Sequence, residues 1–289
     1  MRKVTVCIIT YNMSGYLERL IKALQEQTLG IENFDILIAD DGSGDGTEEL
    51  LSKKTFSGVI YKKFERYGRG NMRNFCLWIT KTPWIAFTDA DCIPEAVWLE
   101  SLLSCAEKNG YSAVEGKTIL TEPDRPMTHA VFSESGGTFL TCNILYKRHD
   151  LLVSGGFMPA MFMHEDTEAG LSVSENFPCG FSEDAVVSHP PRQIGFFKSL
   201  AAAPFEAREI FRAENLLSIR HPGRYGEVRW TPHCEEALKA LAFKYSLISM
   251  RRFVKTYKRY PAASFFQLII YLWKQLFIIS NYLRGIRAY

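Results

Sequence analysis

The stretch Trp84-Ile85-Ala86-Phe87-Thr88-Asp89-Ala90-Asp91 runs from an apolar segment directly into two carboxylates. A short apolar run bounded by polar residues predicts a buried strand. Three earlier runs, at residues 4–9, 36–39 and 59–61, have the same character, and helical spacing of apolar residues separates the first two. Strands that alternate with helices predict an α/β fold with a mostly parallel central sheet flanked by helices.

Polar clusters follow three of the predicted strands, at residues 10–12, 40–46 and 89–91. Ligands of such sheets bind at the carboxyl ends of the strands, so we expect the three clusters to form one site. A helix is expected over residues 71–80, and the next is expected to begin at Pro94 and to bury Val97, Trp98, Leu102 and Leu103.

Asp89 and Asp91 are the first candidate ligands. Two carboxylates at i and i+2 on a strand end can converge on a hard cation such as Mg²⁺ or Mn²⁺, which prefers oxygen ligands. The alternative is a solvated loop in which Asp91 caps the following helix. The position beside two other polar strand ends favours the metal site.

Other motifs are excluded by spacing. Residues 41–46 start like a calcium loop, but Ser52 stands where a bidentate glutamate is required. The glycines at 68 and 70 lack the third glycine of a dinucleotide fingerprint. Arg73 is then a candidate anion ligand at a helix start, or simply a surface arginine.

The segment His164-Glu165-Asp166-Thr167-Glu168 lacks the second histidine of a zinc protease. Clustered carboxylates raise each other's pKa, which suits one of them to general-base work. A helix is also expected over residues 166–174, and acidic side chains stabilise the first turn of a helix. The acidic residues can serve as a general base and stabilise the helix at once. His189 alone is more typical of a structural histidine than of a ligand.

Charge and cysteines bound the class of protein. Ten Lys/Arg and one Glu lie in residues 236–289, whereas the rest of the chain has 24 basic and 31 acidic residues. The acidic body disfavours a nucleic-acid-binding protein. The seven cysteines form no C-x-x-C pair and indicate buried thiols in a reducing compartment. Neither a secretory signal nor an 18-residue apolar span is present, so we expect a cytoplasmic protein.

Taken in order, several motifs over about residues 3–189 resemble family 2 glycosyltransferases of the GT-A (nucleotide-diphospho-sugar transferase) fold. They are Val6-Cys7-Ile8-Ile9-Thr10-Tyr11-Asn12, Asp40-Asp41-Gly42-Ser43, Gly70-x-x-Arg73-Asn74, Asp89-Ala90-Asp91, Cys142-Asn143, Gly155-Gly156-Phe157 and Glu165-Asp166. The resemblance implies a nucleotide-sugar donor, a divalent cation (Mn²⁺ or Mg²⁺), and a carbohydrate or lipid-linked acceptor.

The resemblance also implies residue roles. The nucleotide-sugar would be bound by Thr10, Tyr11, Asn12, Asp40 or Asp41, Arg73 and Asp89. Asp89 and Asp91 would hold the metal, with His189 as a further ligand. Asp166 would be the catalytic base, with Glu165 beside it on the acceptor side.

The implied reaction is transfer of one sugar, with inversion, in bacterial-type polysaccharide or glycolipid synthesis, and a UDP-sugar is the donor that the family favours. Processive members carry Q-x-x-R-W, but Gly226 stands at the glutamine position before Arg229-Trp230. Two alternatives remain open: a catalytically inactive nucleotide-sugar-binding module, and a sugar-nucleotide pyrophosphorylase, although the segment after the first strand is not that enzyme's glycine-rich basic loop.

We expect a nucleotide-sugar-binding half at residues 1–120, an acceptor-binding half at 121–234 and a basic amphipathic helical extension at 235–289. The extension has a basic cluster at residues 251–259 and an apolar helix face after Pro261. Such a helix can dock on an anionic membrane surface, here the inner face of the cytoplasmic membrane, or pack on the catalytic domain or a second subunit.

Overall fold

The computed structural model describes residues 2–52, 56, 58–123, 125, 127–225, 265–266, 268–274, 276–277 and 280. The chain forms two compact units, one of Met1–Thr121 with Val131–Pro190 and one of Glu122–Ala130 with Pro191–Tyr289. The boundaries expected at residues 120 and 234 stay predictions. The basic cluster at 251–259, Cys234 and the Arg229-Trp230 pair lie outside the described residues.

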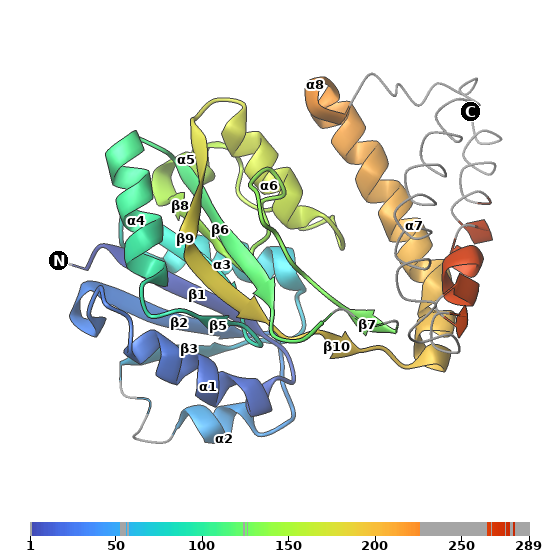
Figure 1. Ribbon diagram of the computed structural model, residues 1–289, viewed down its shortest axis with the longest axis horizontal. Helices are drawn as coiled ribbons and strands as arrows, with labels where there is room; N and C mark the ends of the chain where they lie inside the picture. The colour runs from blue at the N-terminus through green and yellow to red at the C-terminus, as the bar shows by residue number, and fades with distance from the viewer. Residues whose placement is uncertain are drawn as a thin grey trace. The chain divides into compact units, whose positions relative to one another are not determined.

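The first unit contains one sheet and the helices around it (Figure 1). Its strands are β1 (Val4–Thr10), β2 (Phe34–Asp40), β3 (Val59–Lys63), β4 (Trp84–Asp89), β5 (Ile93–Pro94), β6 (Ala113–Leu120), β8 (Ile144–Lys147) and β9 (Cys179–His189). Its helices are α1 (Ser14–Gln25), the 3-10 turn η1 (Ile31–Asn33), α2 (Thr47–Leu51), α3 (Arg69–Ile79), α4 (Trp98–Asn109), α5 (Arg148–Val153) and α6 (Glu165–Ser174).

The strand order is β3-β2-β1-β4-β8-β6-β9-β5. The four strands predicted in the first half of the chain all form, and β3, β2, β1 and β4 are mutually parallel. β8 is antiparallel to β4 and β6, while β6 and β9 are parallel. The predicted mostly parallel sheet is therefore confirmed.

Alternate residues of the strands face opposite layers of helices, as the two-residue period of a strand requires. Val4, Val6 and Ile8 of β1 join the core that α1 and α4 cover, with fully buried Trp98. Cys7 faces the other way, toward Thr80 at the end of α3. Cys7, Cys76, Cys92 and Cys142 are buried free thiols, in accord with the sequence prediction.

The helix expected to begin at Pro94 begins at Trp98, so that prediction is wrong. Pro94 lies in the short edge strand β5, opposite Val187 of β9. Proline has no N–H to donate to a neighbouring strand, so within a sheet it is found on edge strands. Val97, expected on the buried face, is largely exposed, and the carboxamide of Gln27 accepts from Leu99 N–H at the helix start.

The second unit contains α7 (Phe196–Arg220), α8 (Pro222–Tyr225) and a two-stranded ladder of β7 (Thr128–His129) and β10 (Arg192–Gln193). Described helical residues after position 264 lie against α7: the rings of Phe196 and Phe266 are 4.8 Å apart, and Lys274 forms an ion pair with Glu206. In the part of the chain that is described, no helix combines the length and apolarity that a membrane span needs.

Candidate active site

The carboxyl ends of β1, β2 and β4 bring the predicted polar clusters to one edge of the sheet. Thr10 pairs with Asp40 in the β1–β2 register, and Ile9 pairs with Asp89 in the β1–β4 register. The parallel registers therefore align three strand ends that lie 30 to 79 residues apart in the sequence. This is the edge at which α/β sheets bind ligands.

The two aspartates after β2 have different surroundings. Asp40 is fully buried; its Oδ2 accepts from Tyr61 Oη at 2.7 Å and its Oδ1 from Ser43 N–H at 2.8 Å. Asp41 accepts from the N–H groups of Tyr67, at 2.7 Å, and Gly68, which fixes the loop that leads into α3. Asp41 is also buried, so both carboxylates are held by hydrogen bonds within the protein.

Residues 10–12 form the rim of this edge. Tyr11 is 37% exposed, and the guanidinium of Arg66 lies over its ring at 3.6 Å from the centroid. Asn12 has a φ of 52°, and its Oδ1 accepts from Gly44 N–H at 2.9 Å. Thr10 Oγ1 is buried and has no hydrogen-bond partner among the described residues. Arg66 was not predicted, because nothing in a lone arginine within a loop signals a stacked position.

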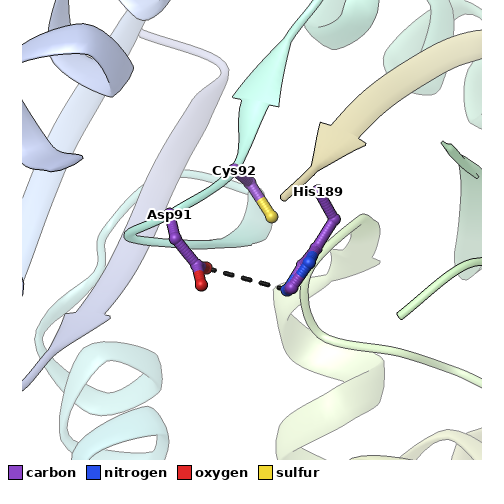
Figure 2. A group of neighbouring side chains, drawn as sticks. All are labelled: Asp91, Cys92 and His189. Atoms are coloured by element: carbon purple, nitrogen blue, oxygen red, sulfur yellow. Dashed lines mark ion pairs between the residues drawn. The ribbon is translucent and has the colours of Figure 1, made fainter. Parts of the chain in front are cut away.

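A second group brings Asp91, Cys92 and His189 together (Figure 2). One ligand atom from each lies within 4.8 Å of the others, and all three side chains are buried. Asp91 Oδ1 is 3.8 Å from His189 Nε2. Asp91 follows β4 and His189 ends β9, so two strand ends nearly 100 residues apart meet here. Asp89 is not in this group.

The chemistry of the pair suits a divalent cation. His189 Nδ1 lies 3.0 Å from the carbonyl oxygen of Pro190, and because a carbonyl can only accept, Nδ1 carries the proton. In the neutral ring Nε2 is then the nitrogen that can bind a metal, and it makes no hydrogen bond within the described residues. This is the arrangement by which proteins orient a metal-binding histidine. A carboxylate ligand suits Mg²⁺ and Mn²⁺, whereas an imidazole ligand is more usual for later divalent metals such as Zn²⁺.

Cys92 is a poor third ligand for a hard cation. The hydrogen bond with the Cys142 thiol, together with burial, raises the pKa of Cys92 well above its ordinary value. The thiolate is the metal-binding form, so Cys92 remains a protonated, apolar wall of the site at neutral pH.

The acidic pair opens α6. His164, with a φ of 61°, precedes the helix, and Glu165 and Asp166 are its first residues. Glu165 is 2% exposed, and its Oε1 lies 2.6 Å from Arg73 Nη1 and 3.3 Å from Arg69 Nε. Asp166 is half-buried, and its Oδ1 accepts from Thr167 N–H at 2.8 Å. Burial and the neighbouring Glu165 carboxylate raise the pKa of Asp166, although Arg73 opposes the shift.

Arg73 connects the two acidic groups of the site. Its guanidinium is buried and interacts electrostatically with Glu165, Asp166 and Asp89. Arg73 therefore interacts with one residue predicted from a strand end, Asp89, and with both residues of the acidic pair. The sequence left Arg73 as an anion ligand or a surface arginine; its burial excludes the surface arginine, and its ion pair with Glu165 was not predicted.

Glu115, on β6, is a further buried carboxylate that sequence reasoning missed. It accepts from the N–H groups of Gly137, Thr138 and Phe139. The carbonyl of Thr138 in turn accepts from Thr167 Oγ1 on α6 at 3.0 Å. Glu115 thereby holds the loop that contacts the start of α6.

The chain is similar to one protein family and to several known proteins. The family model described as "Glycosyl transferase family 2" matches residues 5–159. The chain is 28% identical over 218 residues to "Glycosyltransferase AglE" of Haloferax volcanii, covering 66% of this chain and 68% of that protein. It is also 28% identical over 137 residues to "Poly(ribitol-phosphate) beta-N-acetylglucosaminyltransferase TarP" of Staphylococcus aureus, covering 46% of this chain and 42% of that one.

Two solved structures share the fold. One is the mannosyltransferase PcManGT from Pyrobaculum calidifontis, in complex with GDP-Man and Mn²⁺, with a TM-score of 0.64 and 18% identity over 97% of this chain and 88% of that one. The other is S. aureus TarS 1–349 in complex with UDP-GlcNAc, with a TM-score of 0.57 and 17% identity over 98% and 92%.

Proposed function

This chain belongs to glycosyl transferase family 2 and has the GT-A fold, and from that premise we propose that it transfers one sugar from a nucleotide-diphosphate sugar to an acceptor hydroxyl with inversion. A nucleotide-sugar donor is supported by the two structural neighbours, whose complexes hold GDP-Man and UDP-GlcNAc. We take a UDP-sugar as the donor. Relatives such as TarP support a role in polysaccharide or glycolipid synthesis.

The donor binds at the edge formed by the ends of β1, β2 and β4. Tyr11 offers an exposed ring face to the base, and Asp41 offers a carboxylate to its N–H. Arg66 already stacks on Tyr11 at 3.6 Å, so the incoming base displaces this guanidinium or stacks against it. A displaced Arg66 would be a positive group available to the negative diphosphate.

Asp91 and His189 hold the divalent cation, Mn²⁺ or Mg²⁺. When bound, such an ion neutralises the charge that develops on the departing diphosphate. The Pro190 carbonyl keeps the proton on His189 Nδ1 and so keeps Nε2 ready as a ligand. Asp89, at the end of β4 and outside this group, would contact the donor's ribose and approach the metal.

Asp166 is the base that takes the proton of the acceptor hydroxyl. Its Oδ1 is occupied by Thr167 N–H, which leaves Oδ2 to receive the proton. A raised pKa brings the carboxylate closer to the working pH of a general base. Glu165 beside it forms ion pairs with Arg73 and Arg69. The observation that carries the proposal is the meeting of Asp91 and His189 at the ends of two strands, with Asp91 Oδ1 3.8 Å from His189 Nε2.

The second unit provides a surface for an anionic membrane. Its described residues expose large apolar side chains on α7 and on the helical residues after 264: Phe197, Phe205, Ile219, Phe265, Phe266, Leu272, Trp273 and Leu276. Phe197 is 82% exposed. Exposed apolar groups on helices are typical of helices that bind at a membrane interface, and they fit a lipid-linked acceptor.

Thermal shift with a panel of nucleotide sugars tests the donor class. We expect UDP-sugars with Mn²⁺ to raise the melting temperature of the full chain, and UDP-sugars with EDTA to raise it less. Stabilisation by none of the UDP- or GDP-sugars would contradict the proposal. Co-sedimentation of the full chain with anionic and neutral vesicles tests the membrane surface, with Phe197→Ser as the variant expected to bind less and Ile60→Ser, an exposed residue of the first unit, as its control.

A further inference from the structure

One face of α3 contacts the acidic pair and the segment that leads to it at four successive places. Residues 154–164 have no regular secondary structure between α5 and α6. Arg69, Gly70 and Asn74 of the helix touch this segment. Arg73, one turn after Arg69, contacts Glu165 just beyond the segment. The segment's position therefore depends on what α3 offers it.

The first contact is made by Asn74. Its Nδ2 donates to the carbonyl oxygen of Phe157 at 2.6 Å, and its Oδ1 accepts from Phe157 N–H at 2.8 Å. One buried carboxamide thus satisfies both main-chain groups of Phe157. A residue with only one polar function cannot do this, and an unsatisfied buried peptide group is costly.

The second contact is close backbone packing at Gly70. A Cβ built on Gly70 would lie 3.2 Å from Met158 O and 3.4 Å from Pro159 Cα. Glycine here lets the helix backbone approach the segment. The third contact is Arg69 Nη2, which donates to Phe162 O at 2.8 Å.

The fourth contact is the ion pair between Arg73 Nη1 and Glu165 Oε1, at 2.6 Å, with both side chains buried. A buried ion pair costs desolvation, so it stabilises little by itself. Losing either partner, however, leaves an uncompensated buried charge, which strongly destabilises the structure around it. The pair therefore holds the two segments together. Glu165 directly precedes Asp166 in the first turn of α6, so fixing one residue fixes the backbone of the next.

We propose that the α3 face of Arg69, Gly70, Arg73 and Asn74 is a clamp that positions Asp166, with the Arg73–Glu165 ion pair as its last contact. This inference rests on the proposed function in that it takes Asp166 as the base. It gives Arg73 a role as a positioning residue instead of the donor-binding role that the family resemblance implies.

Four charged or titratable neighbours affect the pKa of Asp166. Glu165 and His164 belong to its own segment, Arg73 belongs to α3, and Tyr146 on β8 interacts with it electrostatically. Arg73 is the neighbour that opposes the raised pKa of Asp166 most strongly. Removing the Arg73 charge while Glu165 remains must therefore raise the pKa of Asp166 further.

The test compares Arg73→Gln, Arg73→Lys and Lys81→Gln in the full chain. Lys81, an exposed lysine just after α3, is the matched control for loss of one positive charge. Hydrogen–deuterium exchange of peptides covering residues 157–168 measures the clamp without requiring any activity. We expect exchange to be at least about tenfold faster in Arg73→Gln, closer to wild type in Arg73→Lys, and unchanged in Lys81→Gln. If Arg73→Gln fails to fold, Arg69→Gln replaces it. Arg69→Gln removes the hydrogen bond to Phe162 O and the more exposed of the two ion pairs of Glu165, so we expect the same local change in exchange, but a smaller one.

A second measurement uses UDP-GlcNAc hydrolysis against pH, with UDP affinity measured in parallel. We expect Arg73→Gln to bind UDP as wild type does, to turn over more slowly, and to shift the acidic limb of the rate profile to higher pH. Unchanged exchange at 157–168 would overturn the proposal. So would a rate loss that matches a loss of UDP affinity with an unshifted limb, because Arg73 would then bind the donor. If wild type hydrolyses nothing, or Asp166→Asn hydrolyses as wild type, the proposed function fails, whereas the exchange result still decides on the clamp.

Discussion

Replacing Asn143 with alanine is predicted to destabilise the fold where β6 pairs with the irregular part of β9, the strand that ends at His189. β9 contains three extra residues opposite the step from Gly116 to Lys117 of β6, where the register jumps from Ser182 to Val186. Asn143 bridges this irregularity, since its Nδ2 donates to Lys117 O and to Ala185 O, each at 2.9 Å. Its Oδ1 accepts from Trp98 Nε1 at 2.8 Å.

The expected magnitude follows from these three bonds. Alanine leaves the Trp98 N–H and two main-chain carbonyls without this partner, and each such buried group costs about 1–3 kcal/mol. Substitutions that break buried networks seldom exceed about 5 kcal/mol, so we expect a loss of about 3–5 kcal/mol in the free energy of unfolding. At about 2–4 °C per kcal/mol for a chain of this size, the melting temperature falls by roughly 6–20 °C.

Thermal and urea unfolding followed by circular dichroism measure this loss. Asn71→Ala is the matched control, because Asn71 is exposed and makes one hydrogen bond, to Tyr67 O. We expect the control to stay within about 0.5 kcal/mol of wild type. A loss below about 1 kcal/mol for Asn143→Ala would show that the irregularity of β9 does not depend on this side chain.

Three further outcomes are expected. Gly116→Ala should cost about 1–3 kcal/mol in urea unfolding, because a Cβ there would collide with Ala185 O and the Asn143 side chain. Asp166→Asn should lose turnover yet be more stable than wild type at pH 8. The raised pKa means that the native state holds the proton more tightly, so ionisation of Asp166 costs stability as the pH rises above about 4; equal stability at pH 8 would contradict this. The product anomer, determined by NMR coupling constants, should be inverted relative to the donor, and retention would exclude a single displacement assisted by one base.

The strands of the first half could be predicted because each is a short apolar run with a polar end. Parallel strands carry their ligand-binding residues at a shared carboxyl edge, and this rule sufficed to predict that Thr10, Asp40 and Asp89 lie together. β5 could not be predicted in this way, because two residues have no periodicity and Pro94 suits a helix start as well as an edge strand. Tertiary pairing with β9 decided between them.

The candidate site shows the same division. Asp91 was predicted from its place after a strand, and Glu165-Asp166 from clustered charge. The burial of Asp40, the stacking of Arg66 on Tyr11 and the Arg73–Glu165 pair arise from contacts between segments distant in the sequence. Arg73 and Glu165 are 92 positions apart, and a single sequence contains no signal that joins them. From the sequence alone, His189 is more typical of a structural histidine. Its short distance to Asp91 in the fold is what makes it a candidate metal ligand.

Metal-dependent release of UDP from UDP-GlcNAc, measured for wild type and Asp91→Ala with titrated Mn²⁺ and with EDTA, tests the central claim most directly. Lys81→Gln serves as the control variant. We predict that wild type and Lys81→Gln release UDP with Mn²⁺ and not with EDTA, and that Asp91→Ala fails to respond to Mn²⁺ while remaining folded by circular dichroism. Release by Asp91→Ala at the wild-type rate and with the wild-type Mn²⁺ dependence would contradict the assignment of this edge of the sheet as the metal-assisted transfer site.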